Sequence, residues 1–486
     1  MNSAIEDSAQ LAASTRVRDV TFTMSDQRAF AQLSGDFNPM HLDPVASRRF
    51  MYGEVVVHGI HLLLRGIELL ADAQPGFAAL ASVDVEFRTP AKLGIPVRFT
   101  ISERGEREVG LVADVDATLA MRATLTWFER DGPEPMWPSP TEVWQSAPDV
   151  LLREHMRDIA DSTPLVIDRD ATRLMFPALP VAAMADQLAV LLATTRIVGM
   201  HCPGYHSIYS QLQLTFDAKA GEPAPLRYAL DDFDERFNMA DVSLDGNALD
   251  GRIKAFLRPT PQAQPNIATI ARQVRPNEFA ARRALIVGGS RGLGEVSAKI
   301  LAAGGASVAI TFRDGADDAQ RVCDEIREFG AEASVLQYAA GGDLDEIVAF
   351  ADEWQPTDLL FYATPAIKKT DTLFYNDLYF QRFAEVYVRG FSELIDALLS
   401  RVALQRLVYP SSVAVEELTK GMMEYSAAKA AGETICHYVA RRHPSLKIAM
   451  PRLPRMATDQ TVSVLSGADE AAVEYFVELL RFGEAG

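Results

Sequence analysis

Residues 282–305, RRALIVGGSRGLGEVSAKILAAGG, decide the fold of the C-terminal part of the chain. An apolar, strand-like ALIV is followed at once by a glycine-rich turn and then by EVSAKILAA, which is typical of a helix. The turn carries Gly288, Gly292 and Gly294 in the pattern G-x-x-x-G-x-G. Glycines at such a turn let a phosphate group approach the N-terminus of the helix, so the stretch predicts a nucleotide-binding βα unit.

The same rhythm continues through the C-terminal part of the chain. From about residue 281, strand-like runs alternate with helical segments, the further strands being SVAITFR, DLLFYAT, RLVYPSS and LKIAMPR. This alternation is typical of parallel βαβ units. We therefore predict an α/β Rossmann-like, doubly wound parallel sheet, for which about 200 residues suffice.

The N-terminal part has a different order, in which one long apolar helix precedes several strands. The helix is expected at 55–72 (VVVHGIHLLLRGIELLAD) and is followed by four strand-like runs. The order returns between 150 and about 260, with LPVAAMADQLAVLLATT as the second helix. We interpret this as an internal duplication in which each copy wraps an antiparallel sheet around a central helix. A Pro-rich, polar stretch at 130–149 marks the expected linker.

Composition excludes several classes of protein. The chain has 486 residues, 48% hydrophobic and 23% charged, with a formal net charge of -19, which disfavours nucleic acid and anionic membranes as partners. The three cysteines are far apart and predict neither disulfides nor a metal cluster, in keeping with a reducing cytoplasm. We expect no signal peptide, no membrane span and no bound metal.

One polar turn in the first copy stands out. SGDFNPMHLDP (34–44) places Asp36 and His41 between the helix-breaking Gly35 and Pro39, so that the backbone can aim both side chains at one point. No counterpart precedes the second helix, and the second copy therefore keeps the scaffold without the polar pair. The alternative interpretation is that Asp36 caps a helix and that His41 is an ordinary, partly exposed histidine.

Residues 15–130 resemble the MaoC-like (R)-specific enoyl-thioester hydratases of the hot-dog fold, through GDFNPMHLD (35–43) and VVHG (56–59). The resemblance implies that Asp36 and His41 share the acid and base work and that the Gly59 amide binds the thioester carbonyl. It also implies a double hot-dog with one active half and a second half that makes room for the acyl chain. We interpret His58 and His61 as structural.

Residues 281–465 resemble the short-chain dehydrogenases/reductases, especially β-ketoacyl reductases. Beside the glycine loop, the match rests on Ser412, Tyr425 and Lys429, which give Y-x-x-x-K with a Ser thirteen positions earlier. Tyr425 and Lys429 lie one helical turn apart, so we expect the ammonium to lower the pKa of the phenol, which then exchanges a proton with a carbinol while Ser412 holds the oxygen. The alternative is a surface Tyr and Lys on an amphipathic helix.

The chain departs from that family at four places. Val287 stands where Thr is usual, FYAT (361–364) replaces Asn-Asn-Ala-Gly, Tyr387 takes the place of the proton-relay Asn, and MPRLPR replaces Pro-Gly. Each departure concerns either the cofactor or the proton path.

We expect NADP(H) as the cofactor, because Arg291 and Arg313 can meet a 2'-phosphate and no acid occupies Thr311 or Phe312. The predicted cofactor-binding residues are Gly288, Ser290, Arg291, Gly292, Leu293, Gly294, Arg313, Tyr425 and Lys429, and the predicted catalytic residues are Asp36, His41, Gly59, Ser412, Tyr425 and Lys429.

The sequence thus predicts an α+β double hot-dog followed by an α/β Rossmann-like domain, with boundaries at 1–135, 136–275 and 276–486. The predicted function is reduction of a 3-oxoacyl thioester and dehydration of the resulting 3-hydroxyacyl thioester. The predicted partner is a thioester of coenzyme A or of an acyl carrier protein, and the sequence leaves open whether the protein forms a homo-oligomer. Three alternatives are the same pair run oxidatively, a hydratase with a non-catalytic nucleotide-binding module, and an inactive acyl-carrier scaffold.

Overall fold

The computed structural model describes residues 15–74, 76–128, 137–140, 144, 147–219, 223–246, 249–261, 263–367, 375–454, 456 and 472–482. These residues form two compact units, the first ending at Thr260 and the second beginning at Pro261. Most of the linker expected at 130–149 lies outside the described residues. Within them, no helix combines the length and the apolar character that a bilayer crossing requires.

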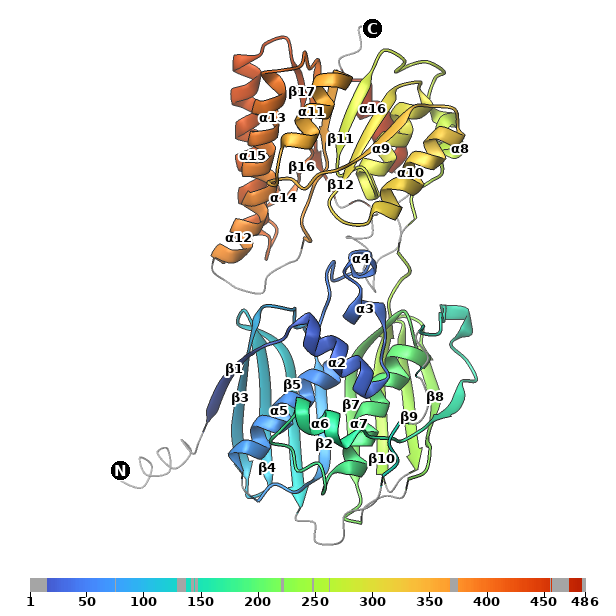
Figure 1. Ribbon diagram of the computed structural model, residues 1–486, viewed down its shortest axis with the longest axis vertical. Coiled ribbons are helices and arrows are strands. Elements are labelled where there is room, and N and C mark those ends of the chain that lie inside the picture. The colour runs from blue at the N-terminus through green and yellow to red at the C-terminus, as the bar shows by residue number, and fades with distance from the viewer. Residues whose placement is uncertain are drawn as a thin grey trace, which may run out of the picture. The chain divides into compact units, whose positions relative to one another are not determined.

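The first unit is a ten-stranded antiparallel sheet with helices on one face (Figure 1). Its first half contains β1 (Arg16–Thr21), α2 (Met24–Ser34), α3 (Pro39–Leu42), α4 (Pro44–Ser47), α5 (Gly59–Ala73), β2 (Ala79–Phe87), β3 (Pro96–Gly105), β4 (Glu108–Val115) and β5 (Thr118–Phe128). Its second half contains the 3-10 turn η1 (Arg153–His155), β6 (Ala160–Thr163), α6 (Arg169–Met175), α7 (Ala185–Arg196), the π-helical turn η2 (Ile197–His201), β7 (Ser207–Phe216), β8 (Leu226–Asp234), β9 (Met239–Gly246) and β10 (Leu249–Leu257).

The strand order of this sheet is the same in both halves. Outward from the centre, one half runs β2-β5-β4-β3-β1 and the other runs β7-β10-β9-β8-β6. The halves join through antiparallel pairing of β2 with β7, from Ser82 opposite Thr215 to Glu86 opposite Gln211. Each half also places its long helix, α5 or α7, before its central strand, as the repeated order in the sequence predicts.

Helices α5 and α7 lie side by side on one face of the sheet (Figure 1). All twelve residues of α7 are buried, and the polar ones among them lie near its two ends: Asp186, Gln187, Thr194, Thr195 and Arg196. The core of the unit consists of these helices and of the inward-facing residues that alternate along the strands, such as Val97, Phe99 and Ile101 of β3. Both helices are therefore packed against the sheet and against each other.

The second unit has a six-stranded parallel sheet in the order β13-β12-β11-β14-β15-β17. Its elements are α8 (Ile267–Ile270), η3 (Ala271–Gln273), β11 (Arg283–Val287), α9 (Gly292–Ala303), β12 (Ser307–Phe312), α10 (Ala316–Glu328), β13 (Ala333–Gln337), α11 (Asp345–Trp354), β14 (Asp358–Phe361), α12 (Asp377–Ala384), the π-helical turn η4 (Glu385–Gly390), α13 (Phe391–Leu399), β15 (Arg406–Val408), β16 (Ser411–Ser412), α14 (Ala414–Glu417), α15 (Met423–Arg442), β17 (Lys447–Ala449), β18 (Arg452–Leu453) and α16 (Ala472–Leu480).

Helices cover both faces of this parallel sheet. Along β11, Ala284 and Ile286 pack into a core with α9, α10 and α16, whereas Leu285 and Val287 pack into a second core with α11, α13 and α15. Alternate residues of one strand thus face opposite layers, which explains why ALIV is apolar throughout. The prediction of a Rossmann-like, doubly wound parallel sheet is confirmed.

Candidate active sites

Asp36 occupies a turn that the end of α2 creates. Helix α2 begins with a capping box between Thr23 and Asp26 and ends at Gly35, whose φ of 76° reverses the chain. The Asp36 carboxylate is 1% exposed; its Oδ1 accepts the backbone N–H of Asn38 at 3.2 Å, and its Oδ2 accepts the hydroxyl of Thr195 at 2.6 Å. The turn therefore buries the Asp36 carboxyl group, which is not what the alternative interpretation of an exposed helix cap requires.

His41 lies in the short helix α3, which Asn38 caps by accepting the Met40 N–H. The His41 ring is 8% exposed, and its Nδ1 lies 2.8 Å from the Val56 carbonyl oxygen. A carbonyl oxygen can only accept, so Nδ1 carries the hydrogen and Nε2 keeps a free lone pair in the neutral ring. His41 is thereby set up as a base at Nε2.

Burial shifts the pKa values of Asp36 and His41 in opposite directions. It raises the pKa of Asp36, against the opposing effects of His41, of the Thr195 and Asn38 hydrogen bonds and of Arg196. It lowers the pKa of His41, against the opposing effects of Asp36 and of the Val56 carbonyl. Both shifts favour a protonated carboxyl beside a neutral imidazole, which is one proton donor beside one proton acceptor.

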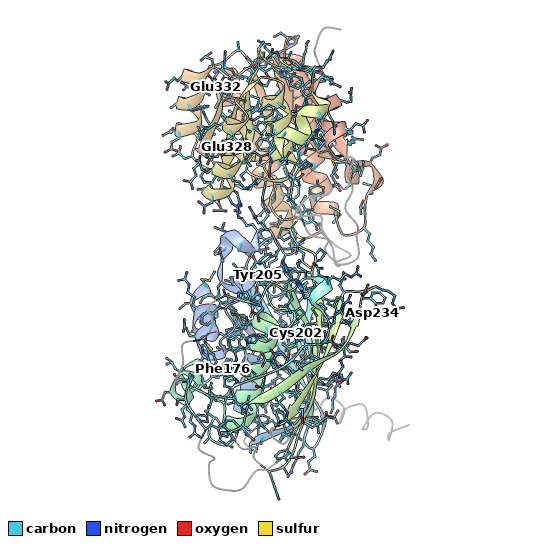
Figure 2. The ribbon with its side chains drawn as sticks, turned by 90° about the vertical axis from the view of Figure 1, so that its right-hand side faces the viewer. Phe176, Cys202, Tyr205, Asp234, Glu328 and Glu332 are labelled. Carbon is cyan, nitrogen blue, oxygen red and sulfur yellow. The ribbon has the colours of Figure 1, made fainter. Side chains whose placement is uncertain are left out.

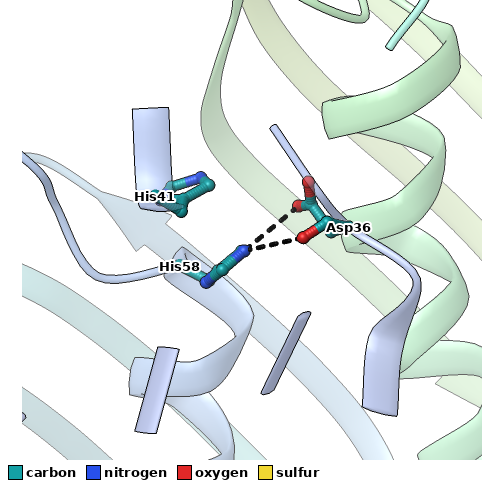
Figure 3. A group of neighbouring side chains, drawn as sticks. All are labelled: Asp36, His41 and His58. Atoms are coloured by element: carbon teal, nitrogen blue, oxygen red, sulfur yellow. Dashed lines mark hydrogen bonds and ion pairs between the residues drawn. The ribbon is translucent and has the colours of Figure 1, made fainter. Parts of the chain in front are cut away.

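His58 joins this pair, although the sequence predicted only a structural role for it. Its ring stacks on His41 with centroids 3.8 Å apart, and its Nε2 lies 3.1 Å from the Asp36 carbonyl oxygen and 4.0 Å from Oδ2 (Figure 3). Its Nδ1 lies 2.8 Å from Gln27 Oε1. Burial, His41 and His61 hold the pKa of His58 well below its usual value. The only signal for this contact was its position directly before Gly59.

Asp36, His41 and His58 bring one potential metal-ligand atom each within 4.8 Å of one another. Metal ligation by two histidines requires their in-plane lone pairs to converge on one point. The rings of His41 and His58 are stacked with an interplanar angle of 25° and centroids 3.8 Å apart, so their lone pairs lie in separate, nearly parallel planes. The arrangement therefore favours proton transfer over metal binding.

Gly59 is the first residue of α5, so the helix begins four residues after the start expected at residue 55. The preceding His58 provides no side-chain cap, so the first turn of the helix offers backbone N–H groups beside the Asp36 and His41 pair. A Cβ at Gly59 would lie 3.1 Å from the Phe87 ring, so glycine also allows that ring to pack against the helix start. The helix start can therefore hold a developing negative charge.

The glycine loop of the second unit joins β11 to α9 and requires its glycines. Gly288 has a φ of +81°, and a Cβ there would lie 2.8 Å from the Ala363 N, while a Cβ at Gly294 would lie 2.2 Å from the Gly288 oxygen. The loop packs too closely for side chains at these positions. Because glycine carries none, a phosphate can approach the backbone at the start of α9. Ser290, Arg291, Gly292 and Leu293 occupy the same loop and the first turn of the helix.

Arg313 lies directly after β12, as expected, but it has a partner that the sequence analysis did not weigh. Its Nε lies 2.6 Å from Asp314 Oδ2, and both side chains are exposed. A 2'-phosphate would therefore compete with Asp314 for the guanidinium.

The structure brings Ser412, Tyr425 and Lys429 together at the start of α15. Ser412 hydrogen-bonds to the Tyr425 hydroxyl, and Lys429 Nζ donates to the Pro410 carbonyl at 2.7 Å. Burial raises the pKa of Tyr425, while the Ser412 hydrogen bond lowers it. Burial also lowers the pKa of Lys429 to about 7. The expectation that Lys429 lowers the pKa of the phenol is wrong for this structure, because burial weakens the ammonium and Ser412 is the group that lowers the pKa.

Tyr387, in the place of the relay Asn, does not point its hydroxyl at Lys429. The hydroxyl hydrogen-bonds to Thr364 Oγ1, and Lys429 Nζ lies over the face of the ring, 3.8 Å from its centroid. The backbone carbonyl of Tyr387 accepts the Tyr409 hydroxyl at 3.3 Å. The π-helical turn η4 places the aromatic face there, and any proton path from Lys429 must pass around it.

The first unit thus places a buried acid and a buried imidazole in one turn, and the second unit is a doubly wound parallel sheet with a glycine-rich loop at the start of α9. Residues 9–123 match the family described as MaoC like domain, and residues 282–453 match the family described as short chain dehydrogenase. The chain therefore carries a MaoC-like domain followed by a short-chain dehydrogenase domain.

Relatives of both parts are known. A 3-oxoacyl-[acyl-carrier-protein] reductase of a Synechocystis species is 26% identical over 42% of this chain and 84% of its own length. An (R)-specific enoyl-CoA hydratase of Aeromonas caviae is 32% identical over 18% of this chain and 66% of its own length. A short chain dehydrogenase of Burkholderia cenocepacia, solved in complex with NADP, is 24% identical over 42% of this chain and 90% of its own, with a TM-score of 0.37.

Proposed function

We propose that the chain is a bifunctional enzyme that reduces a 3-oxoacyl thioester to the (3R)-hydroxyacyl thioester and then dehydrates it to the 2-enoyl thioester. The substrate is carried by coenzyme A or by an acyl carrier protein, in fatty acid or polyketide-type biosynthesis. The observation that carries the proposal is the buried pair of Asp36 and His41, one stabilised as an acid and the other as a base. Hydratase and reductase relatives of the two parts support it.

The proposed dehydration needs one acid and one base within reach of C2 and of the oxygen at C3. His41 Nε2 takes the proton from C2, the electron pair forms the C2–C3 double bond, and the C3–O bond breaks. Asp36 donates its proton to the departing hydroxyl, which leaves as water. Backbone N–H groups at Gly59 hold the thioester oxygen while negative charge develops on it.

The proposed reduction uses the second unit. NADP(H), when bound, supplies the hydride, and the close packing around Gly288 and Gly294 fits a dinucleotide phosphate at the start of α9. Tyr425 donates a proton to the alkoxide oxygen, and Ser412 holds that oxygen through its hydroxyl. Lys429, in its cationic form, contributes to binding of the cofactor.

We also propose the division of the chain into a hot-dog hydratase domain (1–135), a second hot-dog repeat without a polar pair of its own (136–275) and the reductase domain (276–486). The identical strand order in the two halves of the antiparallel sheet supports the repeat.

A second candidate is a hydratase whose nucleotide-binding unit is silent. One observation favours it: the Tyr387 ring covers the Lys429 ammonium while its hydroxyl binds Thr364. Tight NADPH binding without oxidation by any 3-oxoacyl thioester would support this candidate over the bifunctional enzyme.

The test uses the full chain with coenzyme A and carrier-protein thioesters, each with and without NADPH. We expect wild-type protein to hydrate a 2-enoyl thioester and to oxidise NADPH with a 3-oxoacyl thioester. Asp36→Asn and His41→Ala should each lower hydration by about two to four orders of magnitude and leave NADPH oxidation intact. Near-full hydration in either variant would refute the assignment of this site.

A further inference from the structure

The second repeat contacts the acid of the first repeat directly. The last turn of α7 and the π-helical turn η2 lie against Asp36, through Thr195 and Gly199. The Asn38 side chain of the first repeat donates to the Gly199 carbonyl at 3.0 Å and to the Gly204 carbonyl at 3.2 Å. The same loop continues from Cys202 to Tyr205 (Figure 2), where the Tyr205 ring meets Phe50. The second repeat therefore forms one wall of the site.

Thr195 makes the shorter of the two hydrogen bonds to the carboxyl group. Its hydroxyl lies 2.6 Å from Oδ2, within the range of a charge-assisted O–H···O bond, whereas the Asn38 N–H lies 3.2 Å from Oδ1. One donor comes from each repeat, so the carboxyl plane is held from two sides. A hydroxyl can also rotate and accept, so Thr195 can stay hydrogen-bonded when Asp36 carries a proton.

The charged neighbours do not duplicate this contact. Arg196 follows Thr195 on α7, but its guanidinium donates to the Ser34 and Pro164 carbonyls and to the Thr163 hydroxyl. His58 Nε2 stays 4.0 Å from Oδ2, and His41 acts on Asp36 through its charge. Arg196 and His41 thus lower the pKa of Asp36 only through their charge, whereas the Thr195 hydroxyl contacts the carboxyl oxygen itself.

We propose that Thr195 is a positioning residue of the dehydration site, which orients the Asp36 carboxyl and stabilises its ionised form. The inference rests on the proposed hydratase function. Asp36 loses and regains its proton in each turnover, so it passes through the carboxylate each time. Thr195 stabilises that form, and the second repeat thereby takes part in the chemistry in addition to making room for an acyl chain.

The neighbouring Thr194 provides a matched control. It lies on the same helix and is equally buried, but its hydroxyl donates to the Leu191 carbonyl at 2.8 Å. Thr195→Val should lower hydration at neutral pH about tenfold or more, because Asp36 loses the donor that orients it. It should also move the alkaline limb of the pH profile for dehydration, in which Asp36 must carry a proton, up by about one to two units, because a carboxylate without its donor has a higher pKa. Thr195→Ser should restore both values, and Thr194→Val should leave the limb in place.

The outcomes separate the two hypotheses. Wild-type protein that hydrates no enoyl thioester overturns the proposed function and this inference with it. If wild-type protein is active and Thr195→Val has the same rate and the same alkaline limb, the inference alone is overturned. A shift of the alkaline limb in Thr194→Val as large as that in Thr195→Val also overturns it. Should Thr195→Val unfold in circular dichroism, Thr195→Ala provides the same comparison with a smaller side chain, and equal rates there also count against the inference.

Discussion

Gly199 is the position where one added carbon should disable the hydratase. A Cβ at this residue would lie 2.2 Å from Asp36 Oδ1 and 2.5 Å from Oδ2, although ordinary contacts begin at 3.4 Å. Relief of this clash requires a movement of about 1 Å, and a misplacement of that size at a reacting group costs about 100-fold in rate. The turn cannot simply withdraw, because Asn38 is hydrogen-bonded to the Gly199 carbonyl.

We therefore expect Gly199→Ala to lower kcat/KM for hydration about 100-fold, or about 2.7 kcal/mol of transition-state stabilisation. Overpacking should also destabilise the fold by about 1 to 3 kcal/mol, which a thermal melt detects. Hydration of an enoyl thioester is followed by the loss of its absorbance, and NADPH oxidation by the same protein serves as an internal control. Gly76→Ala is the matched variant, because a Cβ there meets nothing within 4 Å. Hydration by Gly199→Ala within about threefold of wild type, in folded protein, would refute the packing argument.

Three further predictions concern the reductase. Tyr425→Phe should abolish NADPH oxidation with a 3-oxoacyl thioester and spare hydration, because the hydroxyl supplies the proton; equal rates in variant and wild type would contradict the role of Tyr425. Burial brings the pKa of Lys429 to about 7, so the cation is lost as pH rises through that value, and NADPH oxidation should fall between pH 7 and 9. A rate that stays flat over this interval would show that the charge is not needed. Arg313→Ala should weaken the binding of NADPH by about 1 to 3 kcal/mol and change the binding of NADH little, whereas Asp314→Ala should strengthen the binding of NADPH. Titration with each cofactor measures these changes. Equal losses of binding for the two cofactors would show that Arg313 does not contact the 2'-phosphate.

Local sequence was enough for the groups that one short segment positions. Asp36 and His41 lie within one turn whose shape depends on Gly35, Asn38 and Pro39, so the motif itself predicts that they meet. The same holds for the glycine loop, because a strand, a tight turn and a helix follow one another directly along the chain.

Contacts between distant segments could not be predicted in this way. Thr195 is separated from Asp36 by 159 positions, and only the pairing of the two halves of the sheet brings α7 against the turn. The orientation of the Tyr387 hydroxyl toward Thr364 likewise depends on how η4 packs against the end of β14. The sequence by itself determined the doubly wound parallel sheet with its glycine loop, the repeated order of helix and strands in the first unit, and the turn that carries Asp36 and His41, since each depends on periodicity or on neighbours along the chain. Only the tertiary structure decided which groups surround those residues, and burial by these groups determines the direction of every pKa shift in the two sites.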